Sequence, residues 1–358
     1  MNSERIFITG GAGFIGSRLV RALTEQGATV LAYDNLHPQV HGPQPQEMPD
    51  VPLVKADIRD GRTLEHAVKD FCPTIVVHLA AETGTGQSAD EPARYSEVNV
   101  CGTAYLIEAL RQLPAPPRRI VLAATRAVYG EGAYVDSAGR RLVPPPRRPA
   151  DMARGIFDLL DEQGRALTPI PTPEDVQLVP GSVYGSTKLM QEYLLQQSPA
   201  PWETVILRLQ NVYGPGQSLR NPYTGVLSIF CQQAMAGKTL NIFEDGNIHR
   251  DFVFVDDVVQ AFVAGCRVEQ AAGRIMNIGT GERAAIGDVA GMILRRLGLP
   301  EDRCRVSGDF RAGDVRHAVA DVRAARAVLG WQHEVSLERG VASLVDWASK
   351  EAAAAHRQ

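Results

Sequence analysis

Across the first 210 residues, short apolar runs alternate with segments in which apolar residues recur every three or four positions. Continuous apolar runs are typical of strands buried on both faces of a parallel sheet, and the three- and four-residue spacing is typical of amphipathic helices. This alternation predicts an α/β fold built on a parallel sheet. Predicted strands span residues 5–9, 29–33, 51–56, 74–79, 119–124 and 204–209, and predicted helices span 17–26, 61–71, 92–113 and 184–197.

The regular alternation loosens after residue 210. A chain of 358 residues is long enough for a large core and for two lobes. We expect residues 351–358 to fray as a terminal tail. The later predicted helices span 226–236, 258–267, 286–297 and 337–350, and the later predicted strands span 240–243 and 274–278.

Residues 131–180 interrupt the pattern with a segment rich in proline, arginine and glycine. The segment has little periodicity, so we interpret it as an insertion rather than a domain, with one helix at 150–163. Loops of this length inside a compact domain are usually functional lids or disordered segments. A lid over the site and a mobile surface loop are both open interpretations.

A glycine-rich turn follows the first predicted strand and opens the first predicted helix. Its glycines are Gly10, Gly13 and Gly16, a spacing that differs from the Gly-x-Gly-x-x-Gly of standard dinucleotide folds. Such a turn can be a plain tight loop, but between a strand and a helix it predicts a phosphate site, because helix N-terminal N–H groups face an anion there. The next strand ends at Asp34-Asn35, where an acid can bind an adenosine ribose and would repel a 2'-phosphate, so NAD is favoured over NADP.

Two further strand ends carry candidate site residues. The strand at 51–56 leads into Asp57-Ile58, which could flank an adenine ring; Asp57 could also cap the helix at 61–71. The strand at 74–79 delivers Ala80-Ala81-Glu82-Thr83-Gly84 to the carboxyl edge of the sheet, where ligands bind in such folds.

The helix predicted to begin near Tyr184 places Tyr184 and Lys188 four residues apart on one face. A cation within reach of a phenol lowers its pKa from about 10 and so gives a proton-transfer group usable near neutral pH. Such pairs also occur on ordinary solvated helix faces, so the glycine turn is what favours a catalytic pair. Thr125 follows the strand at 119–124 and could hydrogen-bond a substrate oxygen beside the phenol, or be only a turn residue.

Composition and charge exclude several classes of function. A formal net charge of -4 with 22% charged residues implies no surface for nucleic acid or membrane. The five cysteines contain no Cys-x-x-Cys pair, which argues against a zinc site and a disulfide framework, so we predict no metal. No apolar run approaches the length of a membrane span, and the first strand begins soon after Met1, which leaves no room for a signal peptide. We therefore expect a cytoplasmic protein.

Taken together, the motifs resemble those of the extended short-chain dehydrogenase/reductases, within the NAD-dependent epimerase/dehydratase family that acts on nucleotide sugars. The resemblance covers nearly the whole chain, and the motifs in this order are highly specific. It implies a Rossmann-type, doubly wound parallel sheet of seven strands with a smaller carboxyl-terminal substrate lobe. The matching motifs are Thr9-Gly10-Gly11-Ala12-Gly13-Phe14-Ile15-Gly16, His78-Leu79-Ala80-Ala81, Val128-Tyr129-Gly130, Tyr184-Gly185-Ser186-Thr187-Lys188, Asn211-Val212-Tyr213-Gly214-Pro215, Arg250-Asp251-Phe252-Val253 and Arg311-Ala312-Gly313-Asp314-Val315-Arg316-His317.

The resemblance also implies how the chain is divided. Residues 1–210 and 251–278 would form the NAD-binding domain, which carries the insertion at 131–180. Residues 211–250 and 279–350 would form the lobe that binds the nucleotide sugar. Members of the family are commonly homodimers joined through a four-helix bundle, for which the helices at 92–113 and 184–197 are the candidates here.

Family roles carry over to the matching positions. Tyr184 would be the acid/base, Lys188 would lower its pKa and hold the nicotinamide ribose, and Thr125 would hydrogen-bond the sugar oxygen. The residues expected to bind NAD are Gly10, Gly13, Phe14, Ile15, Gly16, Asp34, Asn35, Asp57, Ile58, Leu79, Ala80, Ala81, Asn99, Ala123, Tyr184 and Lys188. The residues expected to bind a nucleotide-diphosphate sugar are Thr83, Thr125, Asn211, Arg250, Arg311 and Asp314.

The stretch after Thr125 narrows the activity that the resemblance implies. Nucleotide-sugar 4,6-dehydratases carry an Asp-Glu pair directly after the threonine, and the uronic-acid decarboxylases place a glutamate in that stretch, whereas this chain has Arg126-Ala127. What remains is chemistry at C4 alone, a 4-epimerase, and within that group the chain looks most like the enzymes that act on dTDP-L-rhamnose. A 4-ketoreductase that consumes NAD(P)H and a non-catalytic cofactor-binding scaffold stay open as alternatives.

Overall fold

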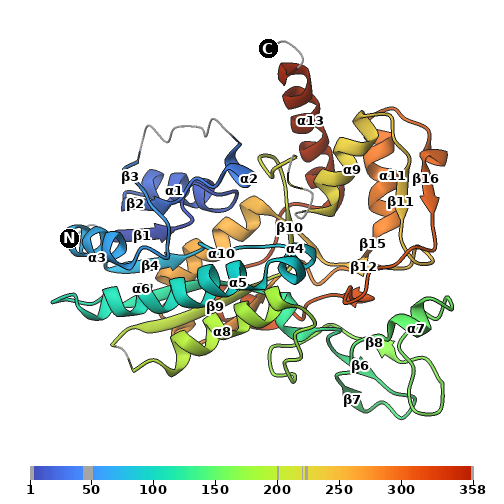
Figure 1. Cartoon of the computed structure of the whole chain (residues 1–358), viewed down its shortest axis with the longest axis horizontal. Helices are drawn as coiled ribbons and strands as arrows, with labels where there is room; N and C mark the ends of the chain where they lie inside the picture. Colours follow the sequence, from blue (N-terminus) through green and yellow to red (C-terminus); the bar gives the residue numbers. More distant parts are fainter. Residues whose placement is uncertain (1–3, 43–50, 200, 220, 222–224, 356–358) are drawn as a thin grey trace.

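The computed structural model describes residues 4–42, 51–199, 201–219, 221 and 225–355. A large sheet covered by helices on both faces occupies one side of the molecule, and a smaller group of helices and short strands lies beyond its carboxyl edge (Figure 1). This architecture confirms the predicted α/β fold of Rossmann type.

The central sheet contains seven parallel strands in the order β14-β9-β5-β4-β1-β2-β3. Thr9 at the end of the first strand lies opposite His78 on one side and Tyr33 on the other. Because the strands are parallel, their carboxyl ends meet at one edge of the sheet. The strands are β1 (Arg5–Thr9), β2 (Thr29–Asp34), β3 (Leu53–Lys55), β4 (Ile75–His78), β5 (Arg119–Thr125), β9 (Glu203–Leu209) and β14 (Ile275–Ile278).

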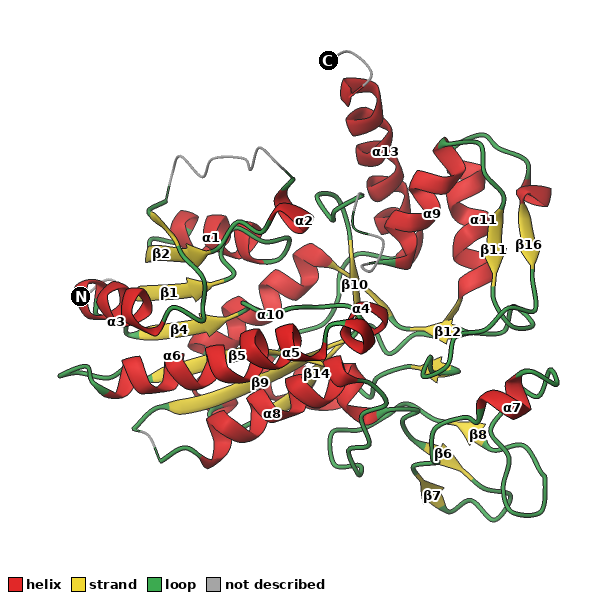
Figure 2. Cartoon of the chain, viewed as in Figure 1, coloured by secondary structure: helices red, strands yellow, loops and turns green. Residues whose placement is uncertain are grey.

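Alternate residues of each strand point into two separate cores, as the period of a β-strand requires. Ile6 and Ile8 of β1 pack in one core with Phe262, whereas Phe7 packs in the other with Leu64 and Leu106. Figure 2 shows α6 and α8 side by side along one face of the sheet. The helices of the first core are α1 (Gly16–Glu25), α10 (Val255–Arg267) and α12 (Arg323–Leu329); those on the other face are α3 (Gly61–Phe71), α6 (Gly102–Arg111) and α8 (Val183–Gln197).

The smaller part packs three helices around a third core that includes Leu227, Leu294 and Leu344. Short strands connect this core to the large sheet's carboxyl edge (Figure 1). The helices are α9 (Val226–Met235), α11 (Ile286–Arg296) and α13 (Leu337–Ala355). The paired strands are β10 (Asn211–Tyr213) with β13 (Phe252–Phe254), β11 (Leu240–Ile242) with β16 (Cys304–Val306), and β12 (His249–Arg250) with β15 (Ala284–Ala285) and β17 (His317–Ala318).

The insertion has its own small sheet, and the helix predicted at 150–163 is wrong. Helix α7 (Pro149–Met152) is a single turn, and the chain reverses at Gly155, whose φ of +77° is a conformation that favours glycine. Three short antiparallel strands form the sheet: β6 (Tyr134–Val135), β7 (Arg141–Leu142) and β8 (Thr168–Pro169).

Other elements also differ from their predicted limits. The helix predicted at 92–113 is made of α5 (Pro92–Tyr95), the π-helix η1 (Ser96–Cys101) and α6. Helix α13 continues to Ala355, so the predicted tail begins as helix. The sequence pattern missed the short helices α2 (Pro38–His41), α4 (Thr85–Asp90) and α12, and the 3-10 turn η2 (Arg126–Tyr129) after β5.

A buried ion pair joins helix α8 to the sheet. Glu192 on α8 and Arg208 on β9 lie 2.7 Å apart, and both side chains are at most 2% exposed. Arg208 also donates to the hydroxyl of Tyr129 at 2.9 Å, which in turn donates to Oδ1 of Asn277 at 2.7 Å. Loss of one partner would leave an uncompensated charge in the core, which is far more costly than breaking an exposed pair.

We expect Arg208→Met to lower the free energy of unfolding by about 3–5 kcal/mol, the range for breaking a buried pair. Urea unfolding followed by far-UV circular dichroism measures this. The matched control is Arg296→Met, because Arg296 pairs with Asp346 on an exposed surface and exposed pairs contribute little. Equal losses in the two variants would contradict the structural role of the buried pair.

Candidate active site

The glycine turn after β1 is packed so closely that side chains are excluded from two positions. Gly10 has a φ of +69°, and a Cβ atom there would lie 2.8 Å from the backbone nitrogen of Ala80. A Cβ atom on Gly16 would lie 2.1 Å from the Gly10 carbonyl oxygen. Helix α1 begins at Gly16, and the amides of Ser17 and Leu19 donate to the carbonyls of Gly13 and Ile15, so what suits the turn to an anion is the close approach that Gly10 and Gly16 allow. The turn therefore fits the diphosphate of a dinucleotide.

Asp34 connects the end of β2 to this turn. Its Oδ2 atom accepts a hydrogen bond from the Ala12 amide at 3.1 Å, and its Oδ1 atom accepts one from the Leu36 amide at 2.9 Å. The neighbouring Asn35 donates to Oδ2 of Asp57 at 3.1 Å. Three residues predicted to bind the adenosine part of NAD thus lie together beside the glycine turn.

Asp57 does not cap helix α3, so the capping interpretation is wrong. The cap is Asp60, whose carboxylate accepts a hydrogen bond from the Thr63 amide at 3.1 Å. Asp57 instead accepts hydrogen bonds from Arg59, which are the main reason that the pKa of Asp57 falls to about 2. Asp57 is therefore ionised at neutral pH and fixed in the loop after β3.

Tyr184 and Thr125 come together where α8 begins beside the end of β5. Ser182 caps the helix, because its Oγ atom accepts a hydrogen bond from the Gly185 amide at 3.1 Å. Burial raises the pKa of Tyr184, and a side-chain hydrogen bond with Thr125 opposes part of that rise. The Tyr184 ring packs edge-on against Tyr95, with ring centroids 6.4 Å apart. The phenol and the hydroxyl that the sequence singled out are therefore neighbours.

Lys188 lies one turn further along α8 and is only 3% exposed. Burial lowers the pKa of Lys188 to about 7, although the charge of Glu192 opposes that change. The Nζ atom of Lys188 donates to Oε1 of Gln191, and Nε2 of Gln191 donates to the Thr103 hydroxyl at 2.7 Å. Gln191 thus holds the ammonium in this structure, and the role of Lys188 in lowering the pKa of Tyr184 stays a prediction.

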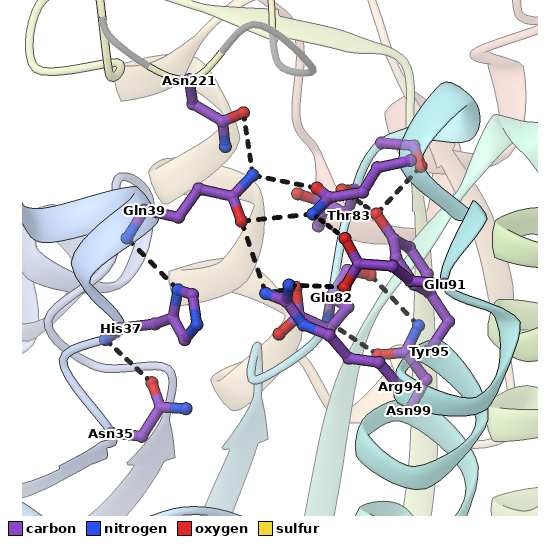
Figure 3. A network of polar contacts seen from close by, with 12 residues as sticks. Asn35, His37, Gln39, Glu82, Thr83, Glu91, Arg94, Tyr95, Asn99 and Asn221 are labelled. Carbon is purple, nitrogen blue, oxygen red and sulfur yellow. Dashed lines mark hydrogen bonds and ion pairs between the residues drawn. The ribbon is translucent and has the colours of Figure 1, made fainter. Parts of the chain in front are cut away.

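A network of polar side chains joins the segments that follow β2 and β4 (Figure 3). Gln39 of α2 donates to Oε1 of Gln87 on α4 at 2.9 Å and to Oδ1 of Asn221 at 3.3 Å. Close by, Arg94 pairs with Glu82 at 2.8 Å. These contacts hold together the segments that follow β2 and β4 at the carboxyl edge of the sheet.

Asn99 joins the loop after β4 to helix α8, and Figure 3 shows its contacts with Glu82 of that loop. Its Oδ1 atom accepts from the Glu82 amide at 2.8 Å, and its Nδ2 atom donates to the Glu82 carbonyl at 3.1 Å and to the Thr187 hydroxyl at 3.0 Å. Asn99 was predicted to bind NAD. In this structure its amide group is engaged with the protein, and it positions the loop that leads to Thr83.

A cleft of about 230 Å³ opens between this edge of the sheet and the smaller part of the molecule. Arg250 lies in it and donates to Oδ1 of Asp314 at 2.7 Å. Five predicted site residues converge on the cleft, namely Thr125, Tyr184, Asn211, Arg250 and Asp314.

Arg126 is a cleft residue that sequence reasoning noted only as the replacement for an acid. It donates to the Gly130 carbonyl at 2.6 Å, and among the described residues it has no carboxylate within ion-pair distance. Burial and the charge of Arg250 lower the pKa of Arg126 to about 10, so it is still charged at neutral pH. Two arginines in one cleft suit the recognition of a diphosphate.

Two residues that line the cleft, Gln210 and Asn211, each have one buried side-chain oxygen without a hydrogen-bond partner in the described part of the chain. The buried atoms Oε1 of Gln210 and Oδ1 of Asn211 accept no hydrogen bond from any described residue. Buried acceptors of this kind normally have partners. Both oxygens are closed off from the cleft itself, so the groups there that suit an anionic ligand are Arg126 and Arg250.

Two predicted substrate residues do not reach the cleft. Arg311 lies over the ring of Phe243, with its guanidinium carbon 5.1 Å from the ring centre. Thr83 is exposed, its carbonyl accepts a hydrogen bond from the Tyr95 hydroxyl, and Thr85 lines the cleft in its place.

Two kinds of feature are absent from the described part of the chain. No group of three or more His, Cys, Asp or Glu side chains there is arranged to hold a metal ion. None of its helices combines the length and the apolar composition that a membrane crossing needs.

The chain is similar in sequence and in structure to known nucleotide-sugar epimerases. The model of the "NAD dependent epimerase/dehydratase family" matches residues 6–154 and 162–279. A dTDP-L-rhamnose 4-epimerase from Burkholderia thailandensis is 41% identical over 98% of this chain and 96% of its own length. The structure of a UDP-glucose 4-epimerase from Thermotoga maritima with UDP-glucose superposes with a TM-score of 0.79 at 29% identity, covering 97% of this chain and 99% of the other. The structure of a Thermus thermophilus UDP-glucose 4-epimerase in complex with NAD gives a TM-score of 0.76 at 29% identity, covering 96% and 99%.

The lowered pKa of Lys188 predicts a pH dependence of stability. The folded protein releases this proton at about pH 7, whereas the unfolded chain releases it at about 10.4. Between these values the unfolded state binds more protons, so this group makes the fold more stable as pH rises. The difference in unfolding free energy between wild type and Lys188→Met should therefore increase between pH 7 and 9.5, by more than about 1.4 kcal/mol, the equivalent of one pKa unit.

Urea unfolding at the two pH values measures this difference. Lys69→Met, which removes an exposed lysine, controls for the loss of a lysine as such. A difference for Lys188→Met that stays constant with pH would show that Lys188 is not shifted.

Proposed function

The chain belongs to the NAD dependent epimerase/dehydratase family, and on that basis we propose that it is an NAD-dependent nucleotide-sugar 4-epimerase with dTDP-L-rhamnose as its substrate. The observation that carries the proposal is the composition of the cleft. Thr125 and Tyr184 share it with Arg250 and Asp314, and Arg126 stands next to Thr125 where dehydration would need an acid. The 41% identity to a dTDP-L-rhamnose 4-epimerase supports the choice of sugar and base.

Proton transfer at the C4 oxygen would be the task of Tyr184. Its hydroxyl lies beside Thr125, which would hydrogen-bond the same substrate oxygen and hold it in line. Because burial raises the pKa of Tyr184, a nearby cation is needed to favour the phenolate, and Lys188 on the next turn of α8 is the candidate.

NAD would be held by the glycine turn and by the loop that carries Asp34, Asn35 and Asp57. The tight packing at Gly10 and Gly16 supports close approach of a diphosphate to the backbone there. When bound, NAD supplies the hydride acceptor and donor for C4. Leu79, Ala80 and Ala81 directly follow β4, and Ala123 lies near the end of the neighbouring strand β5, so these residues are the candidates for contact with the nicotinamide.

The substrate would be anchored by its diphosphate rather than by its sugar. Arg250 and Arg126 would supply the positive charge, and Gln210 and Asn211 line the cleft beside them. Residues 211–250 and 279–350 would supply most of this anchor. A fixed diphosphate leaves the 4-keto sugar free to turn and present its opposite face, which is the positional requirement of an epimerase.

Two other functions fit the composition of the cleft less well. A 4-ketoreductase would use the same Thr125, Tyr184 and Lys188 but would consume reduced cofactor with each turnover. A non-catalytic scaffold of this fold has no need of the catalytic set, which is intact here.

We also propose that the chain forms a homodimer through α6 and α8. Tyr105 on α6 and Met190 and Tyr193 on α8 are large apolar or aromatic side chains that are 39%, 43% and 39% exposed. Exposed apolar groups on neighbouring helices are typical of an interface. Two copies that pair about a two-fold axis would join these helices into a four-helix bundle.

We expect purified protein to sediment as a dimer and Tyr193→Asp to shift it toward the monomer, because a carboxylate would be buried without a partner. Sedimentation velocity at micromolar concentration tests this. Val306→Asp is the control, since Val306 is 56% exposed on β16, away from α8. A monomeric wild type, or equal behaviour of the two variants, would remove the dimer proposal.

The function itself is tested by incubating the protein with dTDP-L-rhamnose and NAD without any reductant. We expect the C4 epimer to appear in the NMR spectrum, with no net change in absorbance at 340 nm. Tyr184→Phe should slow turnover by at least about 100-fold, the scale of a lost acid/base.

Product formation only with stoichiometric loss of NAD(P)H would show a reductase. No conversion of any nucleotide hexose, with NAD bound, would favour the scaffold. A near-normal rate for Tyr184→Phe would show that another group transfers the proton.

A further inference from the structure

The insertion reaches the substrate cleft through a buried cluster of charges, of which only Arg316 belongs to a motif that the sequence singled out. The cluster contains Glu131, Arg147, Glu244 and Arg316, whose side chains are between 1% and 4% exposed. Arg147 comes from the insertion, Glu244 from the turn after β11, and Arg316 from the segment that precedes β17. Two cations and two carboxylates balance one another in the interior, which is the condition for burying them.

The contacts of Arg147 are directed at a wall of the cleft. Its guanidinium pairs with Glu244 at 2.8 Å and donates from Nη2 to the backbone carbonyl of Asp314, also at 2.8 Å. The carboxylate of Asp314 in turn accepts from Arg250 at 2.7 Å. A continuous chain of polar contacts therefore runs from the insertion to the arginine at the anchor end of the cleft.

Arg316 connects the wall of the cleft that contains Asp314 to the opposite side of the cleft. Its backbone amide donates to Oε2 of Glu131 at 3.0 Å, and its guanidinium binds Glu244 and Asp245, at 2.8 Å and 2.7 Å. Glu131 directly follows Gly130, which lines the cleft in the segment that begins with Thr125. The cluster thus connects the segment with the reactive hydroxyl to the segment with the anchor.

The insertion does not cover the cleft. None of its residues between 131 and 180, all of them described, is among those that line it. The insertion lies to one side, next to the smaller part of the molecule (Figure 1). Its connection to the site is the buried cluster and not a surface laid over the substrate.

We propose that Arg147 is a positioning residue, through which the insertion fixes the distance between the Thr125 segment and the Arg250–Asp314 anchor. The inference rests on the proposed function, in which that anchor holds the substrate diphosphate. Without Arg147, the Asp314 carbonyl loses its donor and Glu244 loses one of its two cations. Asp314 is then held less firmly against Arg250, which keeps its own bond to the His249 carbonyl, while the positions of Tyr184 and Thr125 are unaffected.

The test is a comparison of Arg147→Met with Arg148→Met. Arg148 is the next residue in the chain and is 79% exposed, and among the described residues its one ion pair is with Asp151 of the short helix that follows it. For Arg147→Met we expect the KM for dTDP-L-rhamnose and the dissociation constant for dTDP to rise by about tenfold, as for loss of one charge-assisted hydrogen bond at a binding site. Its kcat should stay within about threefold of wild type, and Arg148→Met should match wild type in all three values.

A second variant separates positioning from folding. Arg147→Met leaves Glu131, Glu244 and Arg316 unbalanced, so a loss of stability alone could follow. The double variant Arg147→Met with Glu244→Gln restores charge balance, and it should recover most of the thermal stability while keeping the raised KM and dissociation constant. Recovery of substrate affinity together with stability would overturn the proposal.

The outcomes distinguish this inference from the proposed function. If wild type neither binds dTDP by calorimetry nor converts the sugar, the proposed function fails and the positioning role fails with it. If wild type binds dTDP and Arg147→Met binds it equally well, only the positioning role fails. If Arg147→Met is too unstable to purify, Arg147→Lys answers the same question, because lysine keeps the charge but cannot bind Glu244 and the Asp314 carbonyl with one planar fork.

Discussion

The position of helix α8 against the sheet is the constraint on which the rest of the site depends. Three contacts fix it on one buried face: Thr187 binds Asn99, Gln191 binds Thr103, and Glu192 binds Arg208. A buried polar group without a partner costs about 1–3 kcal/mol, and an unpaired charge costs more. Helix α8 can therefore make all three buried contacts in only one position against the sheet. That position places the Tyr184 hydroxyl beside Thr125.

Much of this arrangement follows from the sequence, because it is set by local pattern and by topology. Apolar runs and helical spacing predict the sheet, and parallel strands deliver their carboxyl ends to a common edge, so the convergence of the glycine turn, Asp34, Thr125 and Tyr184 is predictable. Recognising the family motifs added Asn211, Arg250 and Asp314, whose convergence on the cleft depends on connections too long to derive from periodicity.

The rest could not be predicted, because it depends on pairs that are distant in sequence and carry no pattern. Arg147 meets Glu244 and Asp314 across 97 and 167 residues. Nothing in the proline-rich stretch distinguishes it from the exposed Arg148. The false helix at 150–163 has a related cause: the local composition permits a helix, but Gly155 turns the chain back. Likewise, the pairing of Lys188 with Gln191 became visible only when burial and direction were known.

The π-helix η1 has a consequence for the geometry of the whole edge. One additional residue in a turn rotates everything after it by about 100° around the helix axis. Consequently, the side chains before Ser96 and those after Cys101 point to different sides of the helix. Tyr95 faces the Tyr184 ring, while Leu106 and Leu110 face the sheet. A regular α-helix through residues 92–113 could not make both the contact with Tyr184 and the contacts with the sheet. Deleting a single residue from the wide turn is thus not equivalent to shortening the helix, since it would rotate Tyr95 away from the Tyr184 ring while Leu106 and Leu110 stay on the sheet.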